Sequence, residues 1–221
     1  MRSAYVQVLE IASSMTSEQY KISKHAKYTT LDPISRYLVR NFFSKIGGLL
    51  SNISFENVLD IGCGEGIFLH HIQDHLVGKN VLAIDIDPIE IETAQKNIPF
   101  VKLGVASVYD LPFSDSEFDL VICCEVLEHL QNPDYALQEI WRVTTKYCIL
   151  SVPNEPIWRI LNVCRGAYVA DFGNTPGHVN HWSSRSFRQY ISDYFQIVGT
   201  VTPLPWVGVL GRKKDELESL G

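Results

Sequence analysis

The stretch that decides the fold is Val58-Leu59-Asp60-Ile61-Gly62-Cys63-Gly64-Glu65-Gly66. The apolar residues at its start predict a buried β-strand, and the apolar spacing that begins at Ile67 predicts a helix. The alternating glycines in between allow a ligand to approach the backbone closely. Free N–H groups at the start of the following helix attract a negatively charged part of a ligand. The stretch therefore predicts a strand, a ligand-binding loop and a helix in direct succession.

The same alternation of strands and helices continues outward from this stretch. Runs rich in Val, Ile and Leu predict buried strands over residues 57–61, 80–86, 100–108, 118–124 and 147–152. Helical spacing occupies residues 67–76, 88–97 and 133–145, the last after Asn132 as N-cap. The runs 196–201 and 206–210 are too close together for a crossover helix, so we expect them to pair antiparallel at the sheet edge. The predicted fold is α/β, with a doubly wound, mostly parallel seven-stranded sheet and an antiparallel last strand.

The glycine spacing and the surrounding charge distinguish between two classes of cofactor. A dinucleotide fingerprint requires a glycine at position 67, where the chain has Ile67, and Asp60 and Glu65 repel a pyrophosphate. S-adenosylmethionine carries a sulfonium and an ammonium beside one carboxylate, so acidic neighbours suit it. Asp85 ends the second predicted strand, where open parallel sheets bind ligands, and its carboxylate can accept both ribose hydroxyl groups. Asp87 is expected to cap the next helix.

Several segments together resemble a known family. Residues 60–66, Asp85, 110–113 (Asp-Leu-Pro-Phe), 118–121 (Phe-Asp-Leu-Val) and 125–130 (Glu-Val-Leu-Glu-His-Leu) resemble class I S-adenosylmethionine-dependent methyltransferases, in particular the type 11 and ubiquinone-biosynthesis-like O-methyltransferases. The resemblance implies a Rossmann-like fold in which Gly62 and Gly64 hold the methionine part, Asp85 the ribose, and the end of the third strand the adenine. Similar sequences have an acidic residue at the position of Ser107, whose hydroxyl accepts a weaker hydrogen bond from adenine. The expected cofactor-binding residues are Asp60, Gly62, Cys63, Gly64, Asp85, Ile86, Ser107, Val108 and Glu125.

The segment after the fourth predicted strand carries the candidate catalytic residues. His129 is the candidate general base for a hydroxyl acceptor, because its unperturbed pKa lies near neutrality. Glu128 or Glu125 can orient it, and His181 is the second candidate base. The alternative for His129 is a histidine that only hydrogen-bonds local backbone. We therefore expect O-methylation of a small-molecule, glycan or lipid-like hydroxyl acceptor.

The same residues include metal-ligand types. Glu125, Glu128 and His129, with His178 or His181, offer oxygen and nitrogen ligands for a divalent ion. This set resembles the metal-binding quartet of small-RNA 3′-terminal 2′-O-methyltransferases, but many metal-free methyltransferases have a similar Glu-x-x-Glu-His stretch, so we expect no metal. The alternatives that stay open are a metal-dependent RNA 2′-O-methyltransferase and a non-catalytic scaffold that binds the cofactor.

Size and composition indicate a single domain over the 221 residues, and the resemblance implies that it is a methyltransferase domain. We expect an N-terminal helical cap (1–47), a cofactor-binding core (48–153), a lid insertion (154–182), and a closing helix with edge strands (183–221). The net charge of −6 provides no general basic surface for nucleic acid, which argues against an RNA acceptor. Five cysteines without a C-x-x-C pair, and no signal-peptide or spanning pattern, predict a cytoplasmic protein.

Two segments outside the core are candidates to cover the ligands. Residues 156–166 predict an amphipathic helix with Ile157, Ile160, Leu161 and Cys164 on one stripe. We expect this helix to be a lid over the acceptor pocket, and peripheral membrane contact is the alternative. In the N-terminal segment, the candidates to close over the cofactor are Tyr20, His25, Lys27 and Tyr28, and the alternative for them is an ordinary solvated helix face.

Overall fold

The computed structural model describes residues 33–164, 166 and 168–214. The N-terminal candidates Tyr20, His25, Lys27 and Tyr28 lie outside this part of the chain.

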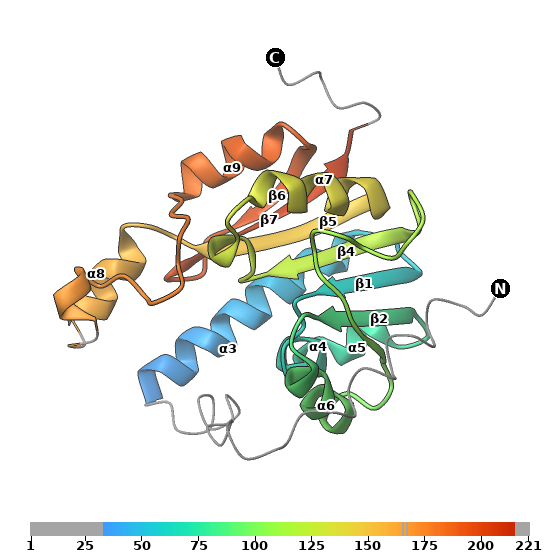
Figure 1. The fold of residues 1–221 in the computed structure, drawn as a ribbon, viewed down its shortest axis with the longest axis horizontal. Helices are drawn as coiled ribbons and strands as arrows, with labels where there is room; N and C mark the ends of the chain where they lie inside the picture. The colour runs from blue at the N-terminus through green and yellow to red at the C-terminus, as the bar shows by residue number, and fades with distance from the viewer. Residues whose placement is uncertain (1–32, 165, 167, 215–221) are drawn as a thin grey trace.

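A seven-stranded sheet in the order β3-β2-β1-β4-β5-β7-β6 runs through the molecule (Figure 1). Its strands are β1 (Asn57–Ile61), β2 (Asn80–Asp85), β3 (Lys102–Val105), β4 (Phe118–Cys124), β5 (Thr144–Pro153), β6 (Phe195–Val201) and β7 (Trp206–Lys213). The pairs among β1 to β5 are parallel, and β7 runs antiparallel to both β5 and β6. The predicted fold class is confirmed. Because the chain moves outward from β1 to β3 and then returns to β4, ligands are expected at the carboxyl ends of β1 and β4.

Helices cover both faces of the sheet (Figure 1). One layer contains α3 (Pro33–Gly48), α4 (Ile67–His71), α5 (Gln73–Leu76) and α6 (Pro88–Asn97), and the other contains α7 (Pro133–Val143) and α9 (Ser184–Ser192). Successive strand residues point to opposite faces, so Val58 lies in the buried cluster that contains Phe42 of α3, whereas Leu59 lies in the cluster that contains Leu137 of α7. The continuous apolar runs of the sequence follow from this two-sided burial.

Three predicted boundaries differ from the structure. The helix expected over 67–76 is divided at Ile72 into α4 and α5. The third strand is shorter than 100–108, because the Val101 N–H bonds to the Ile98 carbonyl in a turn and Ser107 pairs with Asp110. The last two residues of the helix expected over 133–145 belong to β5 instead. They are threonines, whose branched Cβ suits a strand better than a helix.

Residues 154–182 follow β5 and contain α8 (Ile157–Cys164) and η4 (Val169–Asp171). α8 lies at the end of the sheet toward which the arrows of β2 and β4 point (Figure 1). The predicted apolar stripe faces inward only in part: Ile157 and Leu161 are half-buried, whereas Ile160 is 55% exposed and Cys164 is exposed. Asn162 is buried instead. Asn162 Nδ2 donates to the Gly173 carbonyl (2.8 Å), and Trp158 Nε1 donates to Thr175 Oγ1 (2.9 Å). Buried polar groups need such partners, so these two bonds set the orientation of the helix.

None of the helices in the described residues is both long and apolar enough to cross a membrane.

Candidate active site

The glycine loop joins β1 to α4 and is held against the end of β2. Gly62 and Gly64 have φ values of +73° and +52°, a region that glycine enters without strain. The Gly62 N–H donates to the Ile84 carbonyl (2.8 Å), and the Gly64 N–H donates to Asp85 Oδ2 (2.8 Å). A Cβ built on Gly64 meets no atom closer than Glu90 Oε2 at 3.9 Å. The loop therefore leaves open space beside Gly64, as a ligand seat requires.

The Asp85 carboxylate is fixed by two backbone donors. Besides the Gly64 bond, its Oδ1 accepts from the Asp87 N–H (2.9 Å). Each carboxylate oxygen has a second lone pair, so Asp85 can still accept hydroxyl groups of a ligand. Asp87 itself accepts from the Ile89 N–H (2.9 Å), which confirms its predicted role as the N-cap of α6.

Asp60 lies in β1 just before the glycine loop and carries a buried carboxyl group. Burial, followed by the charge of Asp85, raises the pKa of Asp60 to about 7. Burial also raises the pKa of the Cys63 thiol, with the charges of Asp60 and Asp85 adding to the effect. Cys63 therefore stays a protonated thiol and contributes packing rather than thiolate chemistry.

The expected adenine residues lie at the ends of β2 and β3. Ile86 follows Asp85 with 71% of its surface exposed, and Val108 is buried. The Ser107 hydroxyl accepts from the Tyr109 N–H (3.2 Å), a local bond that the sequence prediction did not include. Ser107 keeps its O–H and one further lone pair for a ligand.

Glu125 follows β4 in an unusual backbone conformation. Its φ is +60°, which is uncommon for a residue with a side chain and often marks a functional position. Its N–H donates to the Ser151 carbonyl (3.1 Å), and Ser151 Oγ donates to Glu125 Oε1 (2.9 Å). The next residue, Val126, packs its side chain against Gly62. The loop after β4 therefore touches the glycine loop.

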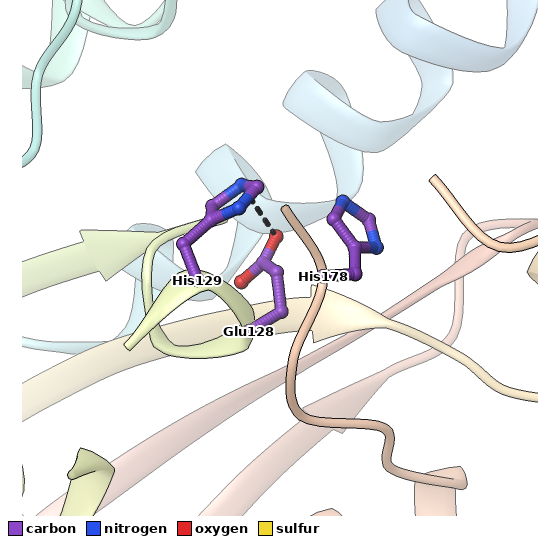
Figure 2. Close-up of side chains that lie close together, drawn as sticks. All are labelled: Glu128, His129 and His178. Carbon is purple, nitrogen blue, oxygen red and sulfur yellow. Dashed lines mark ion pairs between the residues drawn. The ribbon is translucent and has the colours of Figure 1, made fainter. Parts of the chain in front are cut away.

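Glu128 and His129 lie in η3 (Leu127–His129) (Figure 2). Glu128 is 1% exposed, and burial together with the charge of Glu125 raises the pKa of its carboxyl. The side chain of His129 is 47% exposed, with Nε2 3.9 Å from Glu128 Oε1 and Nδ1 3.0 Å from the Gly177 carbonyl oxygen. The Nδ1 atom of the predicted base His129 thus lies beside a backbone carbonyl, and its Nε2 atom faces Glu128.

Tertiary folding brings His178 to this pair (Figure 2). The N–H groups of Val179 and Asn180 donate to the Glu128 carbonyl (2.9 and 3.1 Å), and Asn180 Nδ2 donates to the Leu127 and Leu130 carbonyls (3.1 and 2.6 Å). The rings of His129 and His178 lie 4.9 Å apart. One ligand atom each of Glu128, His129 and His178 lies within 4.8 Å of the others.

Two residues need a different description from the one that the sequence suggests. His181 does not join this group: it is exposed, and its Nε2 lies 2.8 Å from Asn174 Oδ1. Sequence reasoning also missed Asn180, which ties the loop to η3. The loop has no periodicity, so no sequence signal indicates which of its side chains face η3.

A series of ring contacts leads away from this group. His178 stacks with Trp158 of α8 (5.8 Å between centroids), Trp158 contacts Trp206 of β7 (5.6 Å), and Trp206 contacts Phe42 of α3 (4.8 Å). These aromatic residues were not predicted as site residues, because they come from distant parts of the chain.

Comparisons with known proteins relate the central part of the chain to a family. Residues 59–151 match the family model described as a methyltransferase domain. Ubiquinone biosynthesis O-methyltransferase from Rickettsia prowazekii is 33% identical over 114 residues, which cover 50% of this chain and 44% of that protein. Norajmaline N-methyltransferase from Rauvolfia serpentina is 33% identical over 108 residues, which cover 46% of this chain and 34% of that protein. The chain thus spans about half the length, or less, of these relatives.

A solved structure shares the fold over nearly the whole chain. Magnesium protoporphyrin IX methyltransferase from Synechocystis PCC 6803, solved with bound SAH, has a TM-score of 0.62 at 15% identity, and the match covers 96% of this chain and 95% of that one. The predicted resemblance is confirmed: residues 59–151, which carry the glycine loop, Asp85 and the Glu128–His129 turn, match the model of the methyltransferase domain family.

Proposed function

We propose that this protein transfers the methyl group of S-adenosylmethionine to a hydroxyl oxygen of a small molecule. The observation that carries the proposal is the contact between two loops. The glycine loop, which bonds to Asp85, contacts Val126, and Val126 belongs to the loop that carries Glu128 and His129. The relatives support methyl transfer but differ in acceptor atom, since one is named an O-methyltransferase and another an N-methyltransferase. A hydroxyl acceptor must lose a proton, and the imidazole of His129 beside the Glu128 carboxyl group is suited to accept it.

The chain's own residues fit the cofactor. Asp85 accepts the ribose hydroxyl groups, and the backbone of Gly64 leaves room for the methionine part. Asp60, when ionised, attracts the ammonium group, and the exposed Ile86 gives the adenine an apolar surface beside Ser107. Bound S-adenosylmethionine supplies an electrophilic methyl group on a sulfonium.

The acceptor side holds the hydroxyl in line with the bond that breaks. The new C–O bond forms as the C–S bond breaks, and the hydroxyl proton leaves toward the group of Glu128, His129 and His178. Correct orientation of the two reactants alone contributes several kcal/mol, up to roughly 7–11 kcal/mol. Trp158 beside His178, and the exposed Ile160 and Val163 of α8, favour an acceptor with an apolar part. Membrane contact of residues 156–166 and a cytoplasmic location stay predictions.

None of the relatives described above is named as an RNA-modifying enzyme or as a scaffold, so neither of these alternatives is proposed.

Calorimetric titration with the demethylated cofactor tests the cofactor seat. The Asp85→Ala variant loses charge-assisted hydrogen bonds, so its affinity should fall by about 10- to 100-fold. The matched control is Glu92→Ala, which removes an exposed carboxylate from α6 and should bind as the wild type does. Equal affinity of wild type and Asp85→Ala would contradict the ribose role.

The acceptor is tested with cofactor that carries a labelled methyl group. Incubation with fractionated extracts should label a small molecule, and mass spectrometry should locate the methyl group on an oxygen. A product labelled on nitrogen would show that the hydroxyl assignment is wrong while methyl transfer is right.

A further inference from the structure

One side chain joins the loop of residues 174–180 to η3. Asn180 Nδ2 donates to the Leu127 carbonyl (3.1 Å) and to the Leu130 carbonyl (2.6 Å). A carbonyl oxygen only accepts, so the side-chain atom between these two carbonyls is the amide nitrogen, which has one N–H group for each of them. Leu127 and Leu130 lie before and after His129 in the chain. Asn180 therefore holds both ends of the short segment that carries the candidate base.

The same loop holds the imidazole ring of His129. His129 Nδ1 lies 3.0 Å from the Gly177 carbonyl oxygen, and the His178 ring packs edge-on against the His129 ring (Figure 2). Because the carbonyl only accepts, Nδ1 carries the proton of the neutral ring, and Nε2 keeps a lone pair. A general base needs that lone pair. The position and the tautomer of the ring therefore depend on where the loop lies relative to η3.

The other end of the loop is bonded to α8. Thr175 Oγ1 accepts from Trp158 Nε1 (2.9 Å) and from Asn162 Nδ2 (3.3 Å). The Thr175 carbonyl accepts from the His178 N–H (3.1 Å), so the bonds to α8 and the contact with His129 lie on one short stretch of backbone. The loop thus connects α8 with η3.

Backbone bonds alone do not set the orientation of η3. The N–H groups of Val179 and Asn180 both donate to the Glu128 carbonyl, and two bonds that meet at one oxygen leave η3 free to turn about that atom. The side-chain bonds of Asn180 to the Leu127 and Leu130 carbonyls add two further fixed points. We therefore expect the protein to fold without this side chain but to lose the fixed orientation of η3.

We propose that Asn180 is a positioning residue for methyl transfer: by fixing η3 against the loop, it holds His129 in the tautomer whose Nε2 can accept a proton. The role in catalysis rests on the proposed function. The proton of the acceptor hydroxyl passes to Nε2, the oxygen keeps the electron pair and bonds to the methyl group, and the cofactor sulfur takes the electrons of the C–S bond. A displacement of about 1 Å in such an arrangement can lower turnover by about 100-fold.

The first measurement needs no acceptor. Asn180→Leu keeps nearly the shape of asparagine but has neither a donor nor a charge. NMR of ¹⁵N-labelled protein, at a pH where the ring is neutral, reports which nitrogen of His129 carries the proton, and the signals are assigned from their loss in His129→Gln. The wild type should be protonated at Nδ1, and Asn180→Leu should show a mixture of the two tautomers.

Val179→Ala is the matched control, because it shortens an exposed side chain of the same loop and keeps the backbone N–H that bonds to Glu128. Its His129 signals should match those of the wild type. A single Nδ1-protonated ring in Asn180→Leu, or the same mixture of tautomers in Val179→Ala, would overturn the proposal.

The second measurement follows methyl transfer from labelled S-adenosylmethionine to the extract fraction that the wild type methylates. The kcat of Asn180→Leu should fall by about 10- to 100-fold. Its KM for S-adenosylmethionine and its affinity for the demethylated cofactor should stay within about 2-fold of the wild type, because the glycine loop and Asp85 are unchanged. Val179→Ala should turn over as the wild type does.

Two kinetic results would contradict the positioning role. One is a kcat of Asn180→Leu equal to that of Val179→Ala, and the other is a loss of cofactor affinity in parallel with turnover, which indicates general damage to the fold. If the wild type methylates nothing, the proposed function fails, whereas the NMR comparison still decides whether Asn180 holds the His129 ring.

Discussion

Gly62 and Gly64 both have positive φ, but their surroundings differ, so alanine at the two positions should have different effects. A Cβ on Gly62 would lie 2.3 Å from Val126 Cγ2, so Gly62→Ala combines backbone strain with a clash and should destabilise the protein by about 3 kcal/mol. A Cβ on Gly64 meets open space, so Gly64→Ala should cost only the left-handed backbone, about 1–2 kcal/mol. Because that space is the proposed cofactor seat, Gly64→Ala should weaken binding of the demethylated cofactor beyond its effect on stability. Urea unfolding and calorimetry separate the two effects, and a larger stability loss for Gly64→Ala would contradict the reasoning.

Among the elements, α7 fixes the loop that follows Ser107 and Val108. Arg142 of α7 donates to the carbonyls of Phe113 (2.6 Å) and Leu111 (3.0 Å), and Glu139 accepts from the Leu111 N–H (2.9 Å). Arg142→Ala leaves these carbonyls without their charged donor and should lower the free energy of unfolding by about 2–3 kcal/mol. The control is Lys96→Ala, which removes an exposed ion pair of α6 and should cost less than about 0.5 kcal/mol. If urea unfolding shows that Arg142→Ala and Lys96→Ala lower the free energy of unfolding equally, α7 does not hold the loop.

In the whole molecule, burial of Asp60 couples stability to pH. Its pKa is raised from 3.8 to about 7 in the folded protein, so between these values the folded state binds more protons than the unfolded state. Asp60 therefore stabilises the fold fully at low pH, and this stability is lost as pH rises to about 7. The loss is at most about 4 kcal/mol. Asp60→Asn should be no less stable than the wild type at pH 8 and should lose this part of the pH dependence. The measurement is urea unfolding of the wild type and Asp60→Asn from pH 5 to 8. If the free energies of unfolding of the two proteins change with pH in parallel, the raised pKa of Asp60 is contradicted.

The sequence by itself determined the sheet, the glycine loop and the position of Asp85. These features depend on local patterns: apolar runs predict strands, and Asp87 before Pro88 marks a helix start. Because successive parallel strands end at one edge of a sheet, Gly62, Asp85 and Glu125 had to meet there. The predicted ends of helices and strands were less accurate. The helix predicted to end at residue 145 ends at Val143, and Thr144 and Thr145 belong to β5.

Only the tertiary structure decided which side chains of residues 154–182 reach the site. His178 rather than His181 meets Glu128 because Asn180 bonds to the carbonyl of Leu127 in η3 and to that of Leu130 just after it. Trp158 and Asn162 of α8 turn toward the loop, and Ile160 of the apolar stripe is left exposed, because both polar side chains hydrogen-bond to Thr175. These contacts join irregular segments far apart in the chain. No periodicity encodes them, because their partners are backbone carbonyls and side chains that only the folded chain brings together.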